Sequence, residues 1–171
     1  MTTTTPPVGP RVIALAHYAG RAILENVLAR HGVTFQQSVT LRLAAVAEGP
    51  AGRERLVDGV TGALKIDATE VHAVIDELIA ARLLASDEES GVRITDAGRE
   101  LYDTTSGETA PLTARIYDGI PAEDLAVAGR VLSLITERAD AELAALAGSY
   151  RTRQWNIEPT GPVVGLEGGP E

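Results

Sequence analysis

Two short helical patterns in close succession constrain the fold of this chain more than any other feature. Apolar residues recur at helical spacing from Leu56 to Leu64 and again from Val71 to Ile79. In the turn between them, Asp67 is placed to cap the second helix, and Glu70, three residues on, can complete a capping box. The pattern predicts a helix-turn-helix.

A polar turn between two apolar segments follows the helices. Residues 83–86 and 92–95 have strand character and enclose the turn 87–91, so they predict a small β-hairpin. A helix pair followed by a hairpin is how many proteins place one helix in the DNA major groove and a wing beside it. This part of the chain is therefore expected to be a winged helix-turn-helix.

The charge of the same region argues against tight DNA binding. Residues 53–93 carry five basic side chains and nine acidic ones, and the whole chain has a formal net charge of −9. A nucleic-acid binder usually presents a basic face, which supplies its nonspecific affinity. Residues 1–53 have the opposite balance, with five arginines and two glutamates.

Helices are also expected before this region. Residues 11–31 are apolar on more than one helical face, which is typical of a helix buried on two sides or shared with a partner. Gly32 marks its end. Thr34 and Gln37 then form a capping box that opens the next helix, and the Gly-Pro pair at 49–50 closes it.

Two further helices are expected after the hairpin. Thr95 is placed to cap the first of them, which is expected to falter near 106–107 or at Pro111 and to resume at 116–117. Pro121 is expected in the first turn of the last helix, with Glu123 and Asp124 near its positive end.

The last helix has a packing seam. Apolar residues recur along it at spacings of three and four over three heptads, namely Leu125, Ala128, Leu132, Ile135, Ala139, Leu143 and Leu146. The seam belongs either to an intramolecular core or to a dimer helix that pairs with residues 11–31. The Gly- and Pro-rich tail, 149–171, is expected to be irregular, with Trp155 and Ile157 as anchors.

Composition excludes several classes of protein. Without cysteine, the chain cannot form disulfides, thiol redox switches or thiolate metal sites. It has no apolar run of the ~18 residues that span a membrane and no signal-peptide pattern, so a cytoplasmic protein is expected. His17, His31 and His72 lack metal-type spacing, and no serine has a catalytic context. We expect no enzyme, cofactor or metal.

The order of these elements resembles the MarR family of bacterial transcription regulators over about residues 11–147. The resemblance is carried by Thr34 and Gln37 with Leu41, by Val71-x-x-Val74-Ile75-Asp76-x-Leu78, by the wing exit Val92-Arg93-Ile94-Thr95-x-x-Gly98, and by Ile120-Pro121-x-Glu123-Asp124. It implies a homodimer that binds pseudo-palindromic double-stranded DNA and releases it on binding a small, often aromatic or phenolic, ligand.

Several positions depart from the family's pattern. The wing tip, 87–91, has no arginine, whereas the family's wing usually carries one that enters the minor groove. Ala73 and Glu77 stand where the family's second helix usually has basic residues, and Arg82 occupies a position commonly held by glycine. No bidentate guanine reader therefore stands on this helix.

Candidate DNA-contacting residues come from both helices and the wing: Arg53, Arg55, Lys65, Ala68, Thr69, His72, Ala73 and Arg93. Thr69 and His72 are expected to face outward, where they can contact thymine methyl groups and purine acceptors. Arg53 and Arg55 would hold phosphates. The alternative for His72 and the arginines is a solvated surface position without a function.

The resemblance also implies a ligand cavity where the first and second helices meet the fifth. Candidate lining residues combine polar tips with an Ala- and Leu-rich core: His17, Tyr18, Arg21, Phe35 and Tyr102. Arg21 would suit an anionic ligand. The alternative is that these side chains only fill contacts between helices.

The expected fold class is mainly α with a small β-hairpin wing. Its parts are an arm (1–10), a helical dimerisation region (11–33 and 112–148), a winged helix-turn-helix (34–111) and a tail (149–171). The favoured function is a homodimeric, ligand-responsive transcription regulator, a repressor released by its ligand. The alternatives are a winged-helix dimer of weak DNA affinity that binds proteins, and a ligand-binding protein without a macromolecular partner.

Overall fold

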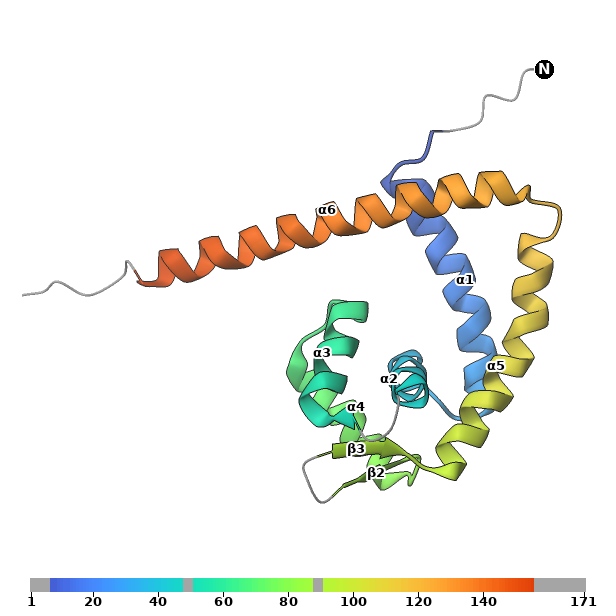
Figure 1. The fold of residues 1–171 in the computed structure, drawn as a ribbon, viewed down its shortest axis with the longest axis vertical. Helices are drawn as coiled ribbons and strands as arrows, with labels where there is room; N and C mark the ends of the chain where they lie inside the picture. The colour runs from blue at the N-terminus through green and yellow to red at the C-terminus, as the bar shows by residue number, and fades with distance from the viewer. Residues whose placement is uncertain (1–6, 48–50, 88–90, 156–171) are drawn as a thin grey trace, which may run out of the picture. The chain divides into compact units, whose positions relative to one another are not determined.

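A computed structural model of the chain describes residues 7–47, 51–87 and 91–155, with side chains as far as Ala147 (Figure 1). The chain forms two compact units that divide between Asp118 and Gly119. The first unit contains α1 (Pro10–Arg30), α2 (Phe35–Val46), β1 (Ala51–Gly52), α3 (Arg53–Leu64), α4 (Ala68–Ala80), β2 (Leu84–Ser86), β3 (Gly91–Ile94) and α5 (Asp96–Tyr117). The second unit contains α6 (Ala122–Trp155). The predicted fold class, mainly α with a small β wing, is confirmed.

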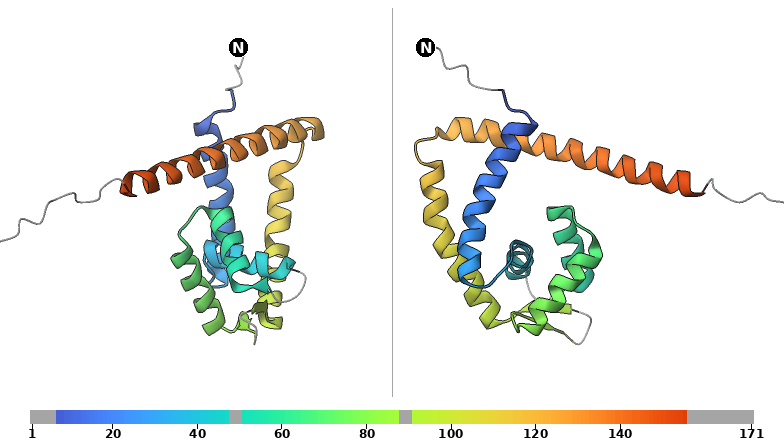
Figure 2. Two further views of the ribbon diagram at one scale, coloured as in Figure 1. Left: turned by 60° about the vertical axis from the view of Figure 1, so that its left-hand side comes forward. Right: turned by 180° about the vertical axis from the view of Figure 1, so that it is seen from behind.

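The first unit is built around α2, which contacts α1, α3, α4 and α5 (Figures 1 and 2). One aliphatic core joins α2, α3, α4 and the sheet, and consists of Leu41, Ala44, Leu56, Val57, Val60, Val71, Val74, Ile75, Leu78, Leu84 and Val92. From α1, Val27 and Leu28 are buried near its C-terminal end. The helical spacing of apolar residues in 53–80 therefore identified the face that packs inward.

Side-chain caps define where two of these helices begin. Thr34 Oγ1 accepts a hydrogen bond from Gln37 N at 3.2 Å, and Gln37 Oε1 accepts one from Thr34 N at 3.0 Å, so the capping box of α2 is confirmed. At α4, Asp67 accepts from Thr69 N at 2.7 Å and not from the amide of Glu70, so the predicted cap is present but the predicted box is wrong. The backbone N–H of Thr69 holds the pKa of Asp67 below its usual value.

Two helix ends in the first unit adopt the left-handed conformation without glycine. Lys65 closes α3 with φ of 56°, and Arg82 follows α4 with φ of 60°. After Arg82 the chain turns back, because Leu83 N donates to Leu78 O at 2.9 Å. The arginine thus takes the geometry expected of a glycine, at a cost of about 1 kcal/mol.

The wing is a three-stranded antiparallel sheet in the order β1-β3-β2. The predicted hairpin is β2 and β3, with Leu84 opposite Ile94 and Ser86 opposite Val92. The sequence did not predict β1, because a two-residue strand has no periodicity to detect. It pairs Ala51 with Val92 and so ties the start of α3 to the wing.

The first turn of α5 lies against the end of α4. Thr95 Oγ1 accepts from Gly98 N at 3.0 Å, which confirms the predicted cap, and donates to Arg82 O at 2.7 Å. A Cβ atom at Gly98 would lie 2.1 Å from Leu83 O and 2.9 Å from Ile94 Cγ1. Glycine is therefore required here for close approach of two backbones.

The predicted interruption of α5 near 106–107 or at Pro111 is wrong. The helix runs without a break from Asp96 to Tyr117 with Pro111 inside it. Pro111 cannot donate to the carbonyl of Gly107, but both residues are exposed, so water can satisfy that carbonyl. A proline on the solvent side of a long helix costs one hydrogen bond without ending the helix.

The second unit consists mainly of α6, which begins and ends slightly later than predicted. The carbonyl of Pro121 accepts from Asp124 N and Leu125 N at 3.1 Å, so Pro121 immediately precedes the helix instead of lying in its first turn. Residues 149–155, predicted to be irregular, are helical because the glycines and prolines of the tail come later. Ile157 and the pair at 49–50 lie outside the described residues.

None of the helices in the described part of the chain combines the length and the apolar character needed to cross a bilayer.

Candidate DNA interface and ligand cavity

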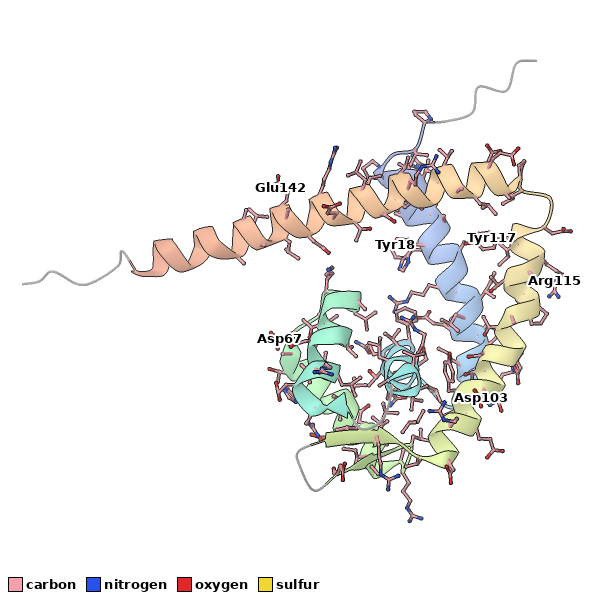
Figure 3. The ribbon with its side chains drawn as sticks, viewed as in Figure 1. Tyr18, Asp67, Asp103, Arg115, Tyr117 and Glu142 are labelled. Carbon is pink, nitrogen blue, oxygen red and sulfur yellow. The ribbon has the colours of Figure 1, made fainter. Side chains whose placement is uncertain are left out.

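The outer face of α4 presents the candidate base-contacting residues. Ala68, Thr69 and Ala73 are exposed and His72 is half-buried, whereas the opposite face of the helix lies in the core. The Asp67 cap fixes where this face begins, in the turn between α3 and α4 (Figure 3). The helix thus offers a methyl, a hydroxyl and an imidazole, all of which suit contacts with base edges.

Arg53 is bound to α4 instead of standing free for a phosphate. Its Nη2 lies 2.6 Å from Asp76 Oδ1 and donates to His72 O at 3.2 Å, and its Nε donates to His72 Nδ1 at 3.3 Å. On the other side of the ring, His72 Nε2 lies 3.9 Å from Glu54 Oε1. The first residue of α3 and the middle of α4 therefore share one polar cluster.

The other predicted cations lie around this face. Arg55 on α3, Lys65 at its end and Arg93 on β3 are all exposed. Together with Arg53 they are outnumbered, because α3, α4 and the turn between them carry six carboxylates: Glu54, Asp58, Asp67, Glu70, Asp76 and Glu77. The predicted acidity of this surface is therefore real, and the tip at 88–90 lies outside the described residues.

A cavity of about 570 Å³ lies between α1, α2 and α5. It is lined by Leu24 and Leu28 of α1, by Ser38, Val39 and Arg42 of α2, and by seven residues of α5 between Tyr102 and Ala114. Among the lining residues, Arg42 is the one with a charge, and it is exposed. The size is within the range of small-molecule sites.

The α5 wall of this cavity is less polar than its sequence suggests. It is rich in threonine and serine, but Thr105 Oγ1 donates to Leu101 O at 2.9 Å and Thr109 Oγ1 donates to Thr105 O at 2.7 Å. Hydroxyl hydrogens that bond to helix carbonyls are not available to a ligand. Other polar residues of the lining, Tyr102, Ser106 and Thr113 of α5 and Arg42 of α2, can still donate to a ligand.

Of the five predicted ligand residues, Tyr102 lines the cavity and the other four do not. His17 and Tyr18 are exposed on α1 and contact each other edge to face, with ring centroids 5.5 Å apart. Arg21 donates to Glu25 Oε1 at 2.8 Å and lies 4.4 Å from the centroid of the Phe35 ring. Arg21 thus contacts α2 through Phe35, whereas His17 and Tyr18 lie on the exposed surface of α1.

A charged cluster joins the end of α1 to α5 beside the cavity. Arg30 pairs with Glu108, and His31 Nε2 lies 3.0 Å from Glu108 Oε1. Arg30, and next His31, hold the pKa of Glu108 below its usual value by hydrogen bonding to its carboxylate. The pairing fixes the spacing of α1 and α5 where Leu28 and Thr109 face the cavity.

Solved structures of transcription regulators share this arrangement. CouR from Rhodococcus jostii RHA1, bound to p-coumaroyl-CoA, is similar with a TM-score of 0.62 and 18% identity, over 73% of this chain and 88% of that chain. A MarR-family regulator from Rhodococcus sp. RHA1 gives 0.61 and 18%, over 73% and 89%. The reduced form of MarR from E. coli gives 0.60 and 15%, over 79% and 97%. The chain has the MarR fold.

The likeness is one of structure. No protein-family model matches the sequence, and no curated protein is significantly similar to it. In this MarR fold, α3 and α4 form the helix-turn-helix, and the sheet of β1, β2 and β3 forms the wing. The sequence differs from the family's usual pattern on α4 and at the wing tip, because Ala73, Glu77 and residues 87–91 stand where the family usually has basic residues.

The sequence interpretation missed Arg42 as a cavity residue. A signal was present, because Ser38, Val39 and Arg42 share one face of α2 at spacings of three and four. A second signal was the column of hydroxyls on α5 at the same spacing, from Tyr102 to Thr113. A column of hydroxyls along one face of a helix is compatible with a cavity wall.

Proposed function

We propose that this chain is a homodimeric transcription regulator of the cytoplasm that reads pseudo-palindromic DNA through α4 and releases it when a small ligand enters the cavity. The observation that carries the proposal is the exposed, Asp67-capped face of α4 inside a MarR fold. A regulator that leaves DNA when its ligand binds acts most simply as a repressor.

Selection from a library of random duplexes tests the DNA-binding part. A C2 dimer places its two reading helices about one helical turn apart, so the selected sequence is expected to be a pseudo-palindrome with half-sites ~10 base pairs apart. Failure to enrich any sequence at low salt would contradict the proposal.

Replacing Glu88 and Glu89 by lysine is expected to strengthen binding to every duplex without improving selectivity. Lysines in the wing act on phosphates, and each new phosphate contact releases about one counterion, so the logarithmic salt slope of a dimer with two wings should steepen by up to about 4. Fluorescence anisotropy at several salt concentrations measures both effects.

The control for this experiment is the pair Glu100→Lys and Asp103→Lys, which makes the same change of charge on exposed positions of α5. If the wing variant bound no better than the wild type at low salt, the wing would not approach DNA. A winged-helix dimer that binds proteins would then be the better supported function.

The proposed dimer rests on exposed apolar side chains in both terminal helices. In α1, Val12, Leu15 and Tyr18 are 39–64% exposed. In α6, exposed apolar residues recur along the helix: Val127, Val131, Leu132, Leu134, Ile135, Leu143 and Leu146. A water-exposed helix with this composition gains free energy when a partner covers it.

The cavity favours a small amphipathic anion as the ligand. Arg42 offers a cation at an exposed position, while Leu24, Leu28 and Val39 offer apolar surface. CouR, a structural neighbour, is named as binding p-coumaroyl-CoA, a ligand with both characters. Arg42, and not Arg21, is then the cation that pairs with an anionic ligand.

Arg42→Gln is expected to weaken binding of carboxylate ligands by about 10- to 100-fold, because a hydrogen bond to a charged group contributes about 1.5–3 kcal/mol. A panel of aromatic and aliphatic carboxylates, compared with their neutral amides by thermal shift, measures this loss. Arg21→Gln is the matched control, since Arg21 does not line the cavity. Equal losses in both variants would place the anion elsewhere.

The alternative function is a winged-helix dimer that binds proteins instead of DNA. It is favoured by the six carboxylates of α3, α4 and the turn between them, and by the pairing of Arg53 with Asp76, which removes a cation from the surface. The duplex selection and the wing variant separate the two functions.

A further inference from the structure

The cluster of Arg53, His72 and Asp76 has a chemical consequence for how α4 presents its histidine. The guanidinium of Arg53 is always charged and can only donate hydrogen bonds. Its Nε donates to His72 Nδ1 at 3.3 Å, so this ring nitrogen is an acceptor and carries no proton. A neutral imidazole with an unprotonated Nδ1 carries its proton on Nε2.

The Nε2–H group of His72 is available to a ligand. Its neighbour Glu54 Oε1 lies 3.9 Å away, which is beyond hydrogen-bond distance, and the side chain is 37% exposed. Thr69 is also exposed on this face, one turn earlier on α4. A single outward donor on such a face can pair with N7 or O6 of a purine, which are acceptors in the major groove.

Asp76 holds Arg53 in the orientation that this arrangement needs. Its carboxylate lies 2.6 Å from Nη2, and the Arg53 side chain is 26% exposed while that of Asp76 is 67% exposed. Carboxylate and phosphate oxygens make equivalent partners for a guanidinium. The Nε and Nη2 donors of an arginine held in this way are already used, so it cannot make a bidentate pair with a DNA phosphate at the same time.

We infer that Arg53 is a positioning residue for base reading and not a phosphate contact. Asp76 keeps it against His72, and Arg53 fixes His72 as an Nε2–H donor toward a purine. The protein thereby gives up one phosphate contact and gains selectivity. The inference rests on the proposed DNA-binding function and replaces the role predicted for Arg53 from the sequence.

The decisive comparison is Asp76→Ala against Glu70→Ala. Both changes remove one negative charge from an exposed position of α4, but Glu70 takes no part in the cluster. Asp76→Ala should release Arg53 of each protomer to a phosphate, so binding to random duplexes should tighten and the logarithmic salt slope of the dimer should steepen by about 2. The preference for the selected duplex over random DNA should fall by about tenfold for each half-site, as on losing one base contact there.

Glu70→Ala should strengthen binding to both duplexes alike and leave the salt slope unchanged. In an Arg53→Gln background, Asp76→Ala should no longer steepen the slope, because the released cation is absent. If Asp76→Ala and Glu70→Ala behaved alike, or if the slope steepened without Arg53, the positioning role would be wrong.

The histidine tautomer tests the inference in the protein without DNA. A ¹⁵N–¹H correlation spectrum of the full chain should show His72 protonated on Nε2, and Arg53→Gln should shift the ring toward a mixture of tautomers. A wild-type His72 protonated on Nδ1 would overturn the inference whether or not DNA binds. An Nε2–H tautomer in a chain that selects no duplex would instead retain the cluster and reject the proposed function.

Discussion

Replacing Gly98 by alanine is expected to destabilise the protein by about 3 kcal/mol or more, at the upper end of what overpacking costs. The added Cβ would lie 2.1 Å from Leu83 O, a backbone atom that cannot move aside as a flexible side chain can. Leu83 O also accepts from Thr95 N at 3.1 Å, so a shift would break the junction between α4, the wing and α5. Urea unfolding followed by circular dichroism measures the loss.

Gly107→Ala is the matched control on the same helix. A Cβ at Gly107 meets no atom within 4 Å, and the position is exposed in the interior of α5. Alanine should therefore stabilise the helix by about 0.5–1 kcal/mol. If Gly98→Ala unfolded at the same urea concentration as the wild type, the close approach of the two backbones would be refuted.

Leu132→Asp or Leu143→Asp is expected to raise the dissociation constant of the dimer by about 10³-fold. The two leucines are 41% and 52% exposed and belong to the seam of α6, so in the proposed dimer they would be covered by the partner. Burying an unpaired carboxylate there costs several kcal/mol, and each 1.4 kcal/mol is a factor of ten. Analytical ultracentrifugation over a range of concentrations gives the constant.

Ala144→Asp is the control for the seam. Ala144 lies one heptad after Glu137 and two after Arg130, on a side of α6 away from Leu132 and Leu143, and it is exposed. It should leave the dimer intact. A wild-type chain that sediments as a monomer at micromolar concentration would contradict the dimer itself, and a dimer unaffected by either leucine change would place the interface on other residues.

Features set by neighbouring residues could be predicted from the sequence. The caps Thr34, Asp67 and Thr95 act within three residues of themselves, and the helical periodicity of α3 and α4 depends on residues one or two turns apart. The predicted capping box at α4 was wrong because the amide of Thr69, and not that of the next residue, Glu70, donates to Asp67. Both amides belong to the first turn, and the sequence does not distinguish them.

Partners far apart in sequence could not be predicted in this way. Arg53 meets Asp76 across 23 positions, and no local pattern distinguishes that pairing from a phosphate contact. Likewise, Arg21 of α1 lies 4.4 Å from the centroid of the Phe35 ring in α2, and only the packing of these two helices decides that contact.

In the proposed regulator, the central position of α2 means that one short helix supports both the ligand cavity and the DNA-reading helix. Ser38, Val39 and Arg42 face the cavity, while Leu41 and Ala44 of the same helix lie in the core shared with α3 and α4. A ligand that displaces α2 would therefore also displace the core residues against which α4 packs. Binding energies coupled in this way are reciprocal. Bound DNA is therefore expected to raise the dissociation constant for the ligand by the same factor by which bound ligand raises the dissociation constant for DNA.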